Sequence, residues 1–190
     1  MFKRAWFKIV KAAPANANRL RWWDKAATEG DGCFSVGVKM SKAADGMYYV
    51  EDVRRGQWSA GQRDSVMKQT ASMDGKAVHI WTEQEPGSGG KESAQSTIKM
   101  LAGYVVKSEG SSGAKEVRAE PFAAQCEAGN VCLIEGPWNA EYIDELCAFP
   151  NGKYNDQVDA SSGAFNKLSF GKKLWFGFSS DSKDEKKPVS

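Results

Sequence analysis

The chain has 190 residues, of which 41% are hydrophobic and 26% charged, and its formal net charge is +2. This composition is ordinary for one globular domain that buries a core without disulfides, and the small net charge neither requires nor excludes a nucleic-acid partner. No apolar run is long enough for a membrane span, and one histidine with four cysteines lacking CxxC spacing argues against a structural zinc site.

The two ends of the chain differ in composition from its middle. Residues 1–18 begin with basic and aromatic side chains and end in a turn-rich stretch, so we expect a linker-like segment there. Residues 179–190 are mostly Ser, Asp and Lys, which predicts a disordered tail. The folded domain is therefore expected to occupy residues 19–178.

The first part of this domain is predicted to be an antiparallel meander of three strands. The strands are expected at residues 19–25, 33–40 and 47–53, where apolar and β-branched side chains concentrate or alternate. Residues 41–46 supply a hairpin connection between the second and third strands.

Helices and short strands alternate after this meander. Helices are predicted at 59–73, 93–101, 115–127 (interrupted by Pro121), 139–147 and 155–168, and strands at 77–82, 104–107 and 131–134. Residues 108–113 are expected to be a flexible connection. The pattern indicates an α/β fold, a mixed sheet covered by helices, in which functional side chains gather at strand ends.

Asp24 stands at the end of the first predicted strand, directly after Trp22 and Trp23. A carboxylate beside two tryptophans is costly to bury unless it is paired, hydrogen-bonded or bound to a cation. The alternative is that Asp24 caps a turn before the Gly-rich residues 29–32.

Glu83 occupies the same kind of position, at the end of the strand predicted over 77–82. The following loop ends in Gly90-Lys91, which invites a phosphate-loop interpretation. That motif needs Gly at position 85 and Ser or Thr at 92, and the chain has glutamate at both. The motif is therefore absent, and Glu85 remains open as a surface residue of the turn.

A third acidic pair, Asp156 and Asp159, begins the last predicted helix, where residues three apart share a face. Acidic residues in a first helical turn also interact favourably with the helix dipole, which is the structural alternative. Asn155 suits the N-cap of that helix. Taken together, three such carboxylate positions indicate an oxygen-ligand cluster for hard divalent cations, and two such metals can hydrolyse a phosphodiester.

Six blocks carry a resemblance to a known family: residues 21–28, 82–91, 115–121, 127–131, 149–152 and 155–160. In this order, over about residues 19–168, they resemble the nuclease domain of the large terminase subunit of tailed bacteriophages. The resemblance implies a ribonuclease H-like fold, with the antiparallel meander followed by parallel strands. It also implies a metal-dependent endonuclease that cuts concatemeric viral DNA when packaging starts and ends.

The resemblance also implies roles for individual residues. Catalysis would rest on the carboxylates Asp24, Glu83 and Asp156, which with Asp159 would bind two divalent metal ions, Mg²⁺ or Mn²⁺. Many members have His-Asp-Asp-Gln-Val-Asp at the last block, whereas this chain has Tyr154 and Asn155 in place of the His and the first Asp.

The implied partners are double-stranded DNA, the packaging ATPase domain, the small terminase subunit and the portal, with no membrane, in the cytoplasm of the infected bacterial host. Basic side chains that would contact DNA phosphates are Lys25, Lys91, Lys115 and Arg118. Their alternative role is that of solvated surface charges. Two other functions stay open: a catalytically weak DNA- or partner-docking module, and another ribonuclease H-like nuclease such as a junction resolvase.

Overall fold

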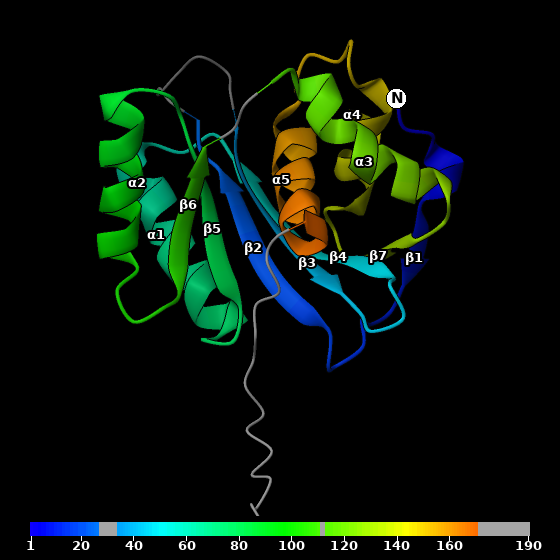
Figure 1. Cartoon of the computed structure of the whole chain (residues 1–190), viewed down its shortest axis with the longest axis horizontal. Coiled ribbons are helices and arrows are strands. Elements are labelled where there is room, and N and C mark those ends of the chain that lie inside the picture. Colours follow the sequence, from blue (N-terminus) through cyan, green and yellow to red (C-terminus); the bar gives the residue numbers. More distant parts are fainter. Residues whose placement is uncertain (27–33, 111–112, 171–190) are drawn as a thin grey trace, which may run out of the picture.

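The computed structural model describes residues 1–26, 34–110 and 113–170. Within these residues a mixed sheet runs through the molecule, with helices on both of its faces (Figure 1). The strands, in the sheet order β1-β7-β4-β3-β2-β5-β6, are β1 (Lys8–Val10), β7 (Val131–Ile134), β4 (Tyr48–Gly56), β3 (Ser35–Lys42), β2 (Asn18–Asp24), β5 (His79–Gln84) and β6 (Val106–Gly110).

The predicted meander is confirmed, because β2, β3 and β4 pair antiparallel in sequence order. The later strands join it in parallel, β5 beside β2, β6 beside β5, and β7 beside β4. The result is the mixed ribonuclease H-like sheet that the resemblance implies. The predicted start of the second strand, Cys33, the Gly-rich residues 29–32 and the tail 179–190 lie outside the described residues.

The helices are α1 (Ala60–Asp74), α2 (Ser88–Met100), α3 (Lys115–Glu127), α4 (Asn139–Ala148) and α5 (Asp156–Phe170), with a 3-10 turn η1 at Arg4–Trp6. Ser59 caps α1 through a capping box with Gln62. α3 continues through Pro121, which corrects the predicted interruption. Its buried residues Ala119, Phe122 and Cys126 pack in the core and hold the helix in place.

The start of α2 differs from the prediction, because the Gly-rich stretch after Gly87 is helical and not a loop. Gly87 adopts a φ of 94°, a left-handed conformation that glycine tolerates. A Cβ atom on Gly90 would lie 1.9 Å from the carbonyl oxygen of Glu85, so this turn requires glycine at position 90. The glycines therefore serve a tight turn into the helix and do not break it. Residues 108–110, expected in a flexible connection, belong to β6.

The prediction for the N-terminal segment also needs correction, because residues 1–18 form part of the folded domain. β1 pairs in parallel with β7 at one edge of the sheet. Phe2 is buried in the core against Phe122 and Phe149. The segment was not predicted as a strand because its three paired residues are too short to show a period.

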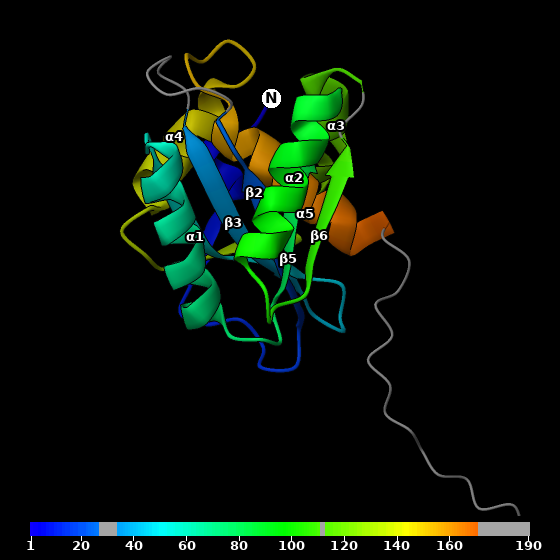
Figure 2. The same ribbon diagram turned by 90° about the vertical axis from the view of Figure 1, so that its left-hand side faces the viewer.

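Neighbouring residues of β2 divide the core between the two faces of the sheet. Trp22 belongs to the larger cluster with α3, α4 and α5, whereas Trp23 packs with Met67 and Ala71 of α1. The two views agree that α1 and α2 lie on the face opposite α5 (Figures 1 and 2). Within the described residues, no helix is long and apolar enough to cross a membrane.

Candidate active site

Asp24 and Glu83 are placed together by the pairing of two parallel strands. Trp22 is opposite Trp81 and Trp23 opposite Thr82, so the next residues along β2 and β5 are Asp24 and Glu83. Side chains alternate along a strand, which puts both carboxylates on the same face as Trp22 and Trp81. Those two indoles stack 6.4 Å apart with an interplanar angle of 4°. This is the face that α5 covers.

α5 brings the other two carboxylates to the same end of the sheet. The start of α5 lies beside the C-terminal end of β2, at the upper end of the molecule in Figure 1. Asp156 is partly exposed there, and Asp159, one turn later, is buried with 6% of its surface exposed. Residues from three distant parts of the sequence therefore lie toward the same end of the sheet.

The electrostatics of Asp24 reflect this convergence. Burial raises the pKa of its carboxyl group well above the ordinary value, and the negative charges of Glu83, Asp159 and Asp156 raise it further. Lys115 opposes the shift. An aspartate in such surroundings is a poor isolated anion and a good ligand for a cation, because a bound cation would offset the burial and the mutual repulsion.

Asp156 is held in a different way. Burial raises the pKa of its carboxyl group, while hydrogen bonds from its own backbone N–H and that of Phe34 oppose this rise, as does the charge of Lys115. Asn155 has the backbone position of an N-cap, since its carbonyl accepts from the Asp159 N–H at 3.0 Å. Among the described residues its Oδ1 has no hydrogen-bond partner. The prediction that the Asn155 side chain caps the helix is therefore wrong.

Asp159 is paired with two cationic side chains from α3. Lys115 Nζ donates to its Oδ2 at 2.5 Å, and Arg118 Nη2 donates to its Oδ1 at 2.9 Å. Burial would lower the pKa of Lys115, but the hydrogen bond and the charge of Asp159 raise it above the ordinary value. Lys115 and Arg118, predicted to contact DNA phosphates, are thus first of all partners of Asp159, although half of the Lys115 side chain remains exposed.

A cleft of about 400 Å³ opens beside Asp24 and Glu83, between the N-terminal ends of α1 and α2. Lys25 lies in it and donates to Ser93 Oγ at 2.8 Å and Thr97 Oγ1 at 2.9 Å. Burial, with a contribution from the charge of Arg63, lowers its pKa to about 8. The side chain is therefore anchored to α2 within the cleft.

Lys91, the remaining predicted DNA contact, is exposed on α2 and does not line the cleft. Arg63 does line it and was missed by the sequence analysis. Nothing local distinguishes Arg63 from Lys68, the other basic residue of α1, so no signal in the sequence marks it. Glu85, left open from the sequence, also lines the cleft.

Tyr154, one of the two departures from the family pattern, has a structural role here. The Tyr154 ring packs edge-on against Phe34, with centroids 4.9 Å apart. The guanidinium of Arg55 lies 3.3 Å from the centre of the Phe34 ring and 5.5 Å from that of Tyr154. Tyr154 thus forms part of an aromatic and cationic stack next to the start of α5.

The carboxylates suit a divalent cation in their chemistry, since aspartate and glutamate oxygens are the ligands that Mg²⁺ and Mn²⁺ take. In the part of the chain that the structure describes, no three acidic, His or Cys side chains are already drawn together closely enough to hold one ion. Burial is the main cause of the raised pKa of Asp24, and the negative charges of Glu83, Asp159 and Asp156 add to it. The residue types fit a divalent metal site.

Comparison with known proteins agrees with this arrangement. Residues 21–168 match the family model of the terminase RNaseH-like domain. No curated protein matches the chain.

Several solved structures share its fold. The large terminase nuclease of thermophilic phage G20c with bound zinc superimposes with a TM-score of 0.62 at 15% identity, over 83% of this chain and 85% of that one. The nuclease domain of the Thermus phage P74-26 large terminase gives 0.59 at 14% identity, over 84% of each chain. The human cytomegalovirus terminase nuclease domain, soaked with Mn and bound to an inhibitor, gives 0.59 at 8% identity, over 79% and 82%.

Proposed function

The chain belongs to the terminase RNaseH-like domain family, and from this membership we propose that it is a metal-dependent DNA endonuclease of a phage packaging motor. It would cut concatemeric viral DNA when packaging starts and when it ends. The observation that carries the proposal is that Asp24, at the end of β2, lies within electrostatic reach of three other carboxylates, those of Glu83, Asp159 and Asp156. Solved relatives with zinc, magnesium or cobalt bound support the use of a divalent metal.

Asp24, Glu83 and Asp156 are the residues that would hold two Mg²⁺ or Mn²⁺ ions. Such ions supply an activated water and stabilise the leaving oxygen of a phosphodiester. The protein contributes rigidity, because Asp24 and Glu83 are fixed by adjacent strands and Asp156 by the start of a helix. Asp159, held by Lys115 and Arg118, would orient the cluster or approach a metal through water.

DNA would enter from the side of the cleft, where Lys25 and Arg63 add positive charge next to the acidic cluster. Lys91 and the exposed part of Lys115 would contact the phosphate backbone nearby. Contacts of this type position DNA without reading its sequence. We therefore propose cleavage with little sequence preference, in the host cytoplasm, in concert with the packaging ATPase domain, the small subunit and the portal.

Nicking of supercoiled plasmid tests this proposal directly. Cleavage is expected with Mn²⁺ or Mg²⁺ and should disappear in chelator, and the cut sites should be distributed along the plasmid. Full activity in chelator, or a fixed pattern of cutting, would refute it.

A second function is favoured by two observations. Asp159 is paired with two cationic side chains, and the described residues hold no ready-made metal cluster. A DNA- or partner-docking module would bind DNA without cutting it at any metal concentration. Cleavage of four-way junctions in preference to plasmid would instead indicate a resolvase-like nuclease.

A further inference from the structure

The first turn of α5 is capped by a side chain from another helix. The N–H groups at the start of a helix lack partners within the helix and need other acceptors. Here Glu145 of α4 accepts the backbone N–H of Gln157 through Oε1 at 2.7 Å and the Gln157 side-chain amide through Oε2 at 2.7 Å. Asn155, the residue in the N-cap position, makes no such bond with its Oδ1. Glu145 therefore caps the start of α5 in place of an N-cap side chain.

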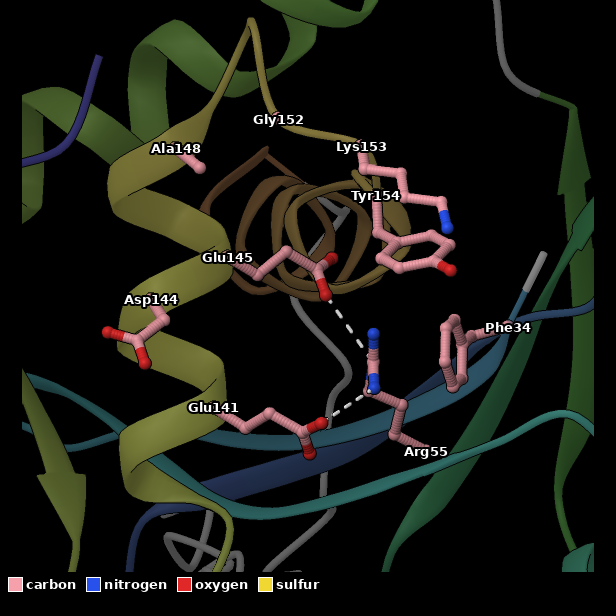
Figure 3. A pocket seen from close by; sticks show the side chains of 9 residues that line it. All are labelled: Phe34, Arg55, Glu141, Asp144, Glu145, Ala148, Gly152, Lys153 and Tyr154. Carbon is pink, nitrogen blue, oxygen red and sulfur yellow. Dashed lines mark hydrogen bonds and ion pairs between the residues drawn. The ribbon is translucent and has the colours of Figure 1, made fainter. Parts of the chain in front are cut away.

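Glu145 is itself anchored by Arg55 of β4. Only 8% of Glu145 is exposed, and Arg55 Nε lies 3.4 Å from its Oε2. The same guanidinium forms a pair with Glu141 Oε1 at 3.0 Å. Figure 3 shows Arg55 facing both glutamates across a pocket of about 320 Å³. Burial raises the pKa of the Glu145 carboxyl group, and the two N–H donors of Gln157 and the charge of Arg55 oppose this rise, so these contacts favour the ionised carboxylate in this position.

The other side of this assembly reaches the acidic cluster. The Phe34 ring packs beside the Arg55 guanidinium, as Figure 3 shows, and the Phe34 backbone N–H donates to the Asp156 carboxylate. Arg55 thus contacts two residues, Glu145 and Phe34, that each hold the start of α5. Gln157, the residue that Glu145 binds, directly follows Asp156.

We propose that Glu145 is a positioning residue: supported by Arg55, it fixes the first turn of α5 so that Asp156 is held toward Asp24 and Glu83 in the geometry that a metal ion needs. This inference rests on the proposed nuclease function. It concerns a residue outside the acidic cluster, on an element that contributes no ligand to it. Groups that orient metal ligands typically contribute about 10- to 100-fold to metal affinity or activity.

Glu145→Ala tests the inference, with Glu141→Ala as the matched control. Glu141 lies one turn earlier on the same helix and pairs with the same Arg55, but its side chain makes no bond to α5 among the described contacts. Glu145→Ala should weaken Mn²⁺ binding, measured by calorimetry, by about 10-fold or more, and raise the Mn²⁺ concentration for half-maximal cleavage in parallel. Hydrogen exchange of the Gln157 amide in the metal-free protein should accelerate. Glu141→Ala should leave all three unchanged.

Glu145→Gln keeps the acceptor oxygen for the Gln157 backbone N–H and should largely restore Mn²⁺ affinity, which a general loss of stability would not explain. If Glu145→Ala does not fold, Gln157→Ala removes one of the two bonds, and a severalfold weaker affinity is expected.

If the folded Glu145→Ala and Gln157→Ala variants bind Mn²⁺ as tightly as Glu141→Ala does, the positioning role is wrong. The nuclease proposal would remain intact. A parent protein that neither binds Mn²⁺ nor cuts DNA would overturn both.

Discussion

Gly163 in the middle of α5 decides how closely this helix approaches the sheet. A Cβ atom at this position would lie 2.3 Å from Trp22 Cε2 and 2.5 Å from Trp22 Nε1, well inside ordinary contact distance. The Trp22 ring has little room to move, since it is 6% exposed and stacks on Trp81. Gly163→Ala should therefore push α5 away from β2, and with it Asp156 and Asp159 away from Asp24.

The size of the effect follows from two opposing contributions. Replacing glycine by alanine within a helix stabilises by about 1 kcal/mol, and overpacking a core costs about 1–3 kcal/mol. The clash is with the Trp22 ring, which Trp81 supports on its other face, so the cost of overpacking should dominate. The free energy of unfolding should fall by about 1–2 kcal/mol. In a domain of this size that corresponds to a fall in melting temperature of roughly 2–8 °C.

The effect on cleavage should be larger than the effect on stability. A displacement of about 1 Å between reacting groups costs about 100-fold in rate, so Gly163→Ala should lose most nicking activity while remaining folded at the assay temperature. Gly61→Ala in α1 is the control, because a Cβ atom there meets no atom within 4 Å. It should gain a few tenths to about 1 kcal/mol and cut like the parent. The reasoning fails if Gly163→Ala matches Gly61→Ala in both melting temperature and nicking.

Three further predictions concern charged groups. Asp24→Asn should lower nicking by orders of magnitude and raise the melting temperature of the metal-free protein at pH 7. The sign follows from the raised pKa of Asp24: its contribution favours folding below the pKa of the unfolded chain and is lost as pH rises through the higher folded value. In chelator, the melting temperature should thus fall less between pH 4 and pH 8 in the variant than in the parent protein. An identical dependence on pH would contradict the raised pKa of Asp24. Asp156→Ala should abolish cutting and Asp159→Ala should only weaken it, compared on plasmid over a manganese titration; the reverse order would make Asp159 the third main ligand. Arg21→Met should lower the free energy of unfolding in urea by about 3–5 kcal/mol. The Arg21 side chain is 1% exposed and binds the buried Asp74 carboxylate at 2.5 Å, and the substitution removes this partner. A loss below about 1 kcal/mol would show that Asp74 is adequately compensated by its other contacts.

Several features of this protein are determined by the sequence alone. Strand and helix periods are local properties, so the meander, the later strands and the capping box at Ser59 follow from residues that are close in sequence. Asp24 and Glu83 could be proposed as partners because each ends an apolar strand, and ends of parallel strands meet at one edge. The six sequence blocks between residues 21 and 160 likewise identify the family, whose model matches residues 21–168.

Only the tertiary structure decides which charges pair. Lys115 and Arg118 lie 44 and 41 residues from Asp159 in sequence, and nothing local shows that they bind it. Glu145 and Arg55 are further apart still, and their contact with the start of α5 exists only once α4 packs beside it. The edge strand β1 depends on β7 in the same way. The physical reason is that the energy of a paired or buried charge depends on its neighbours in space, which a sequence period does not specify.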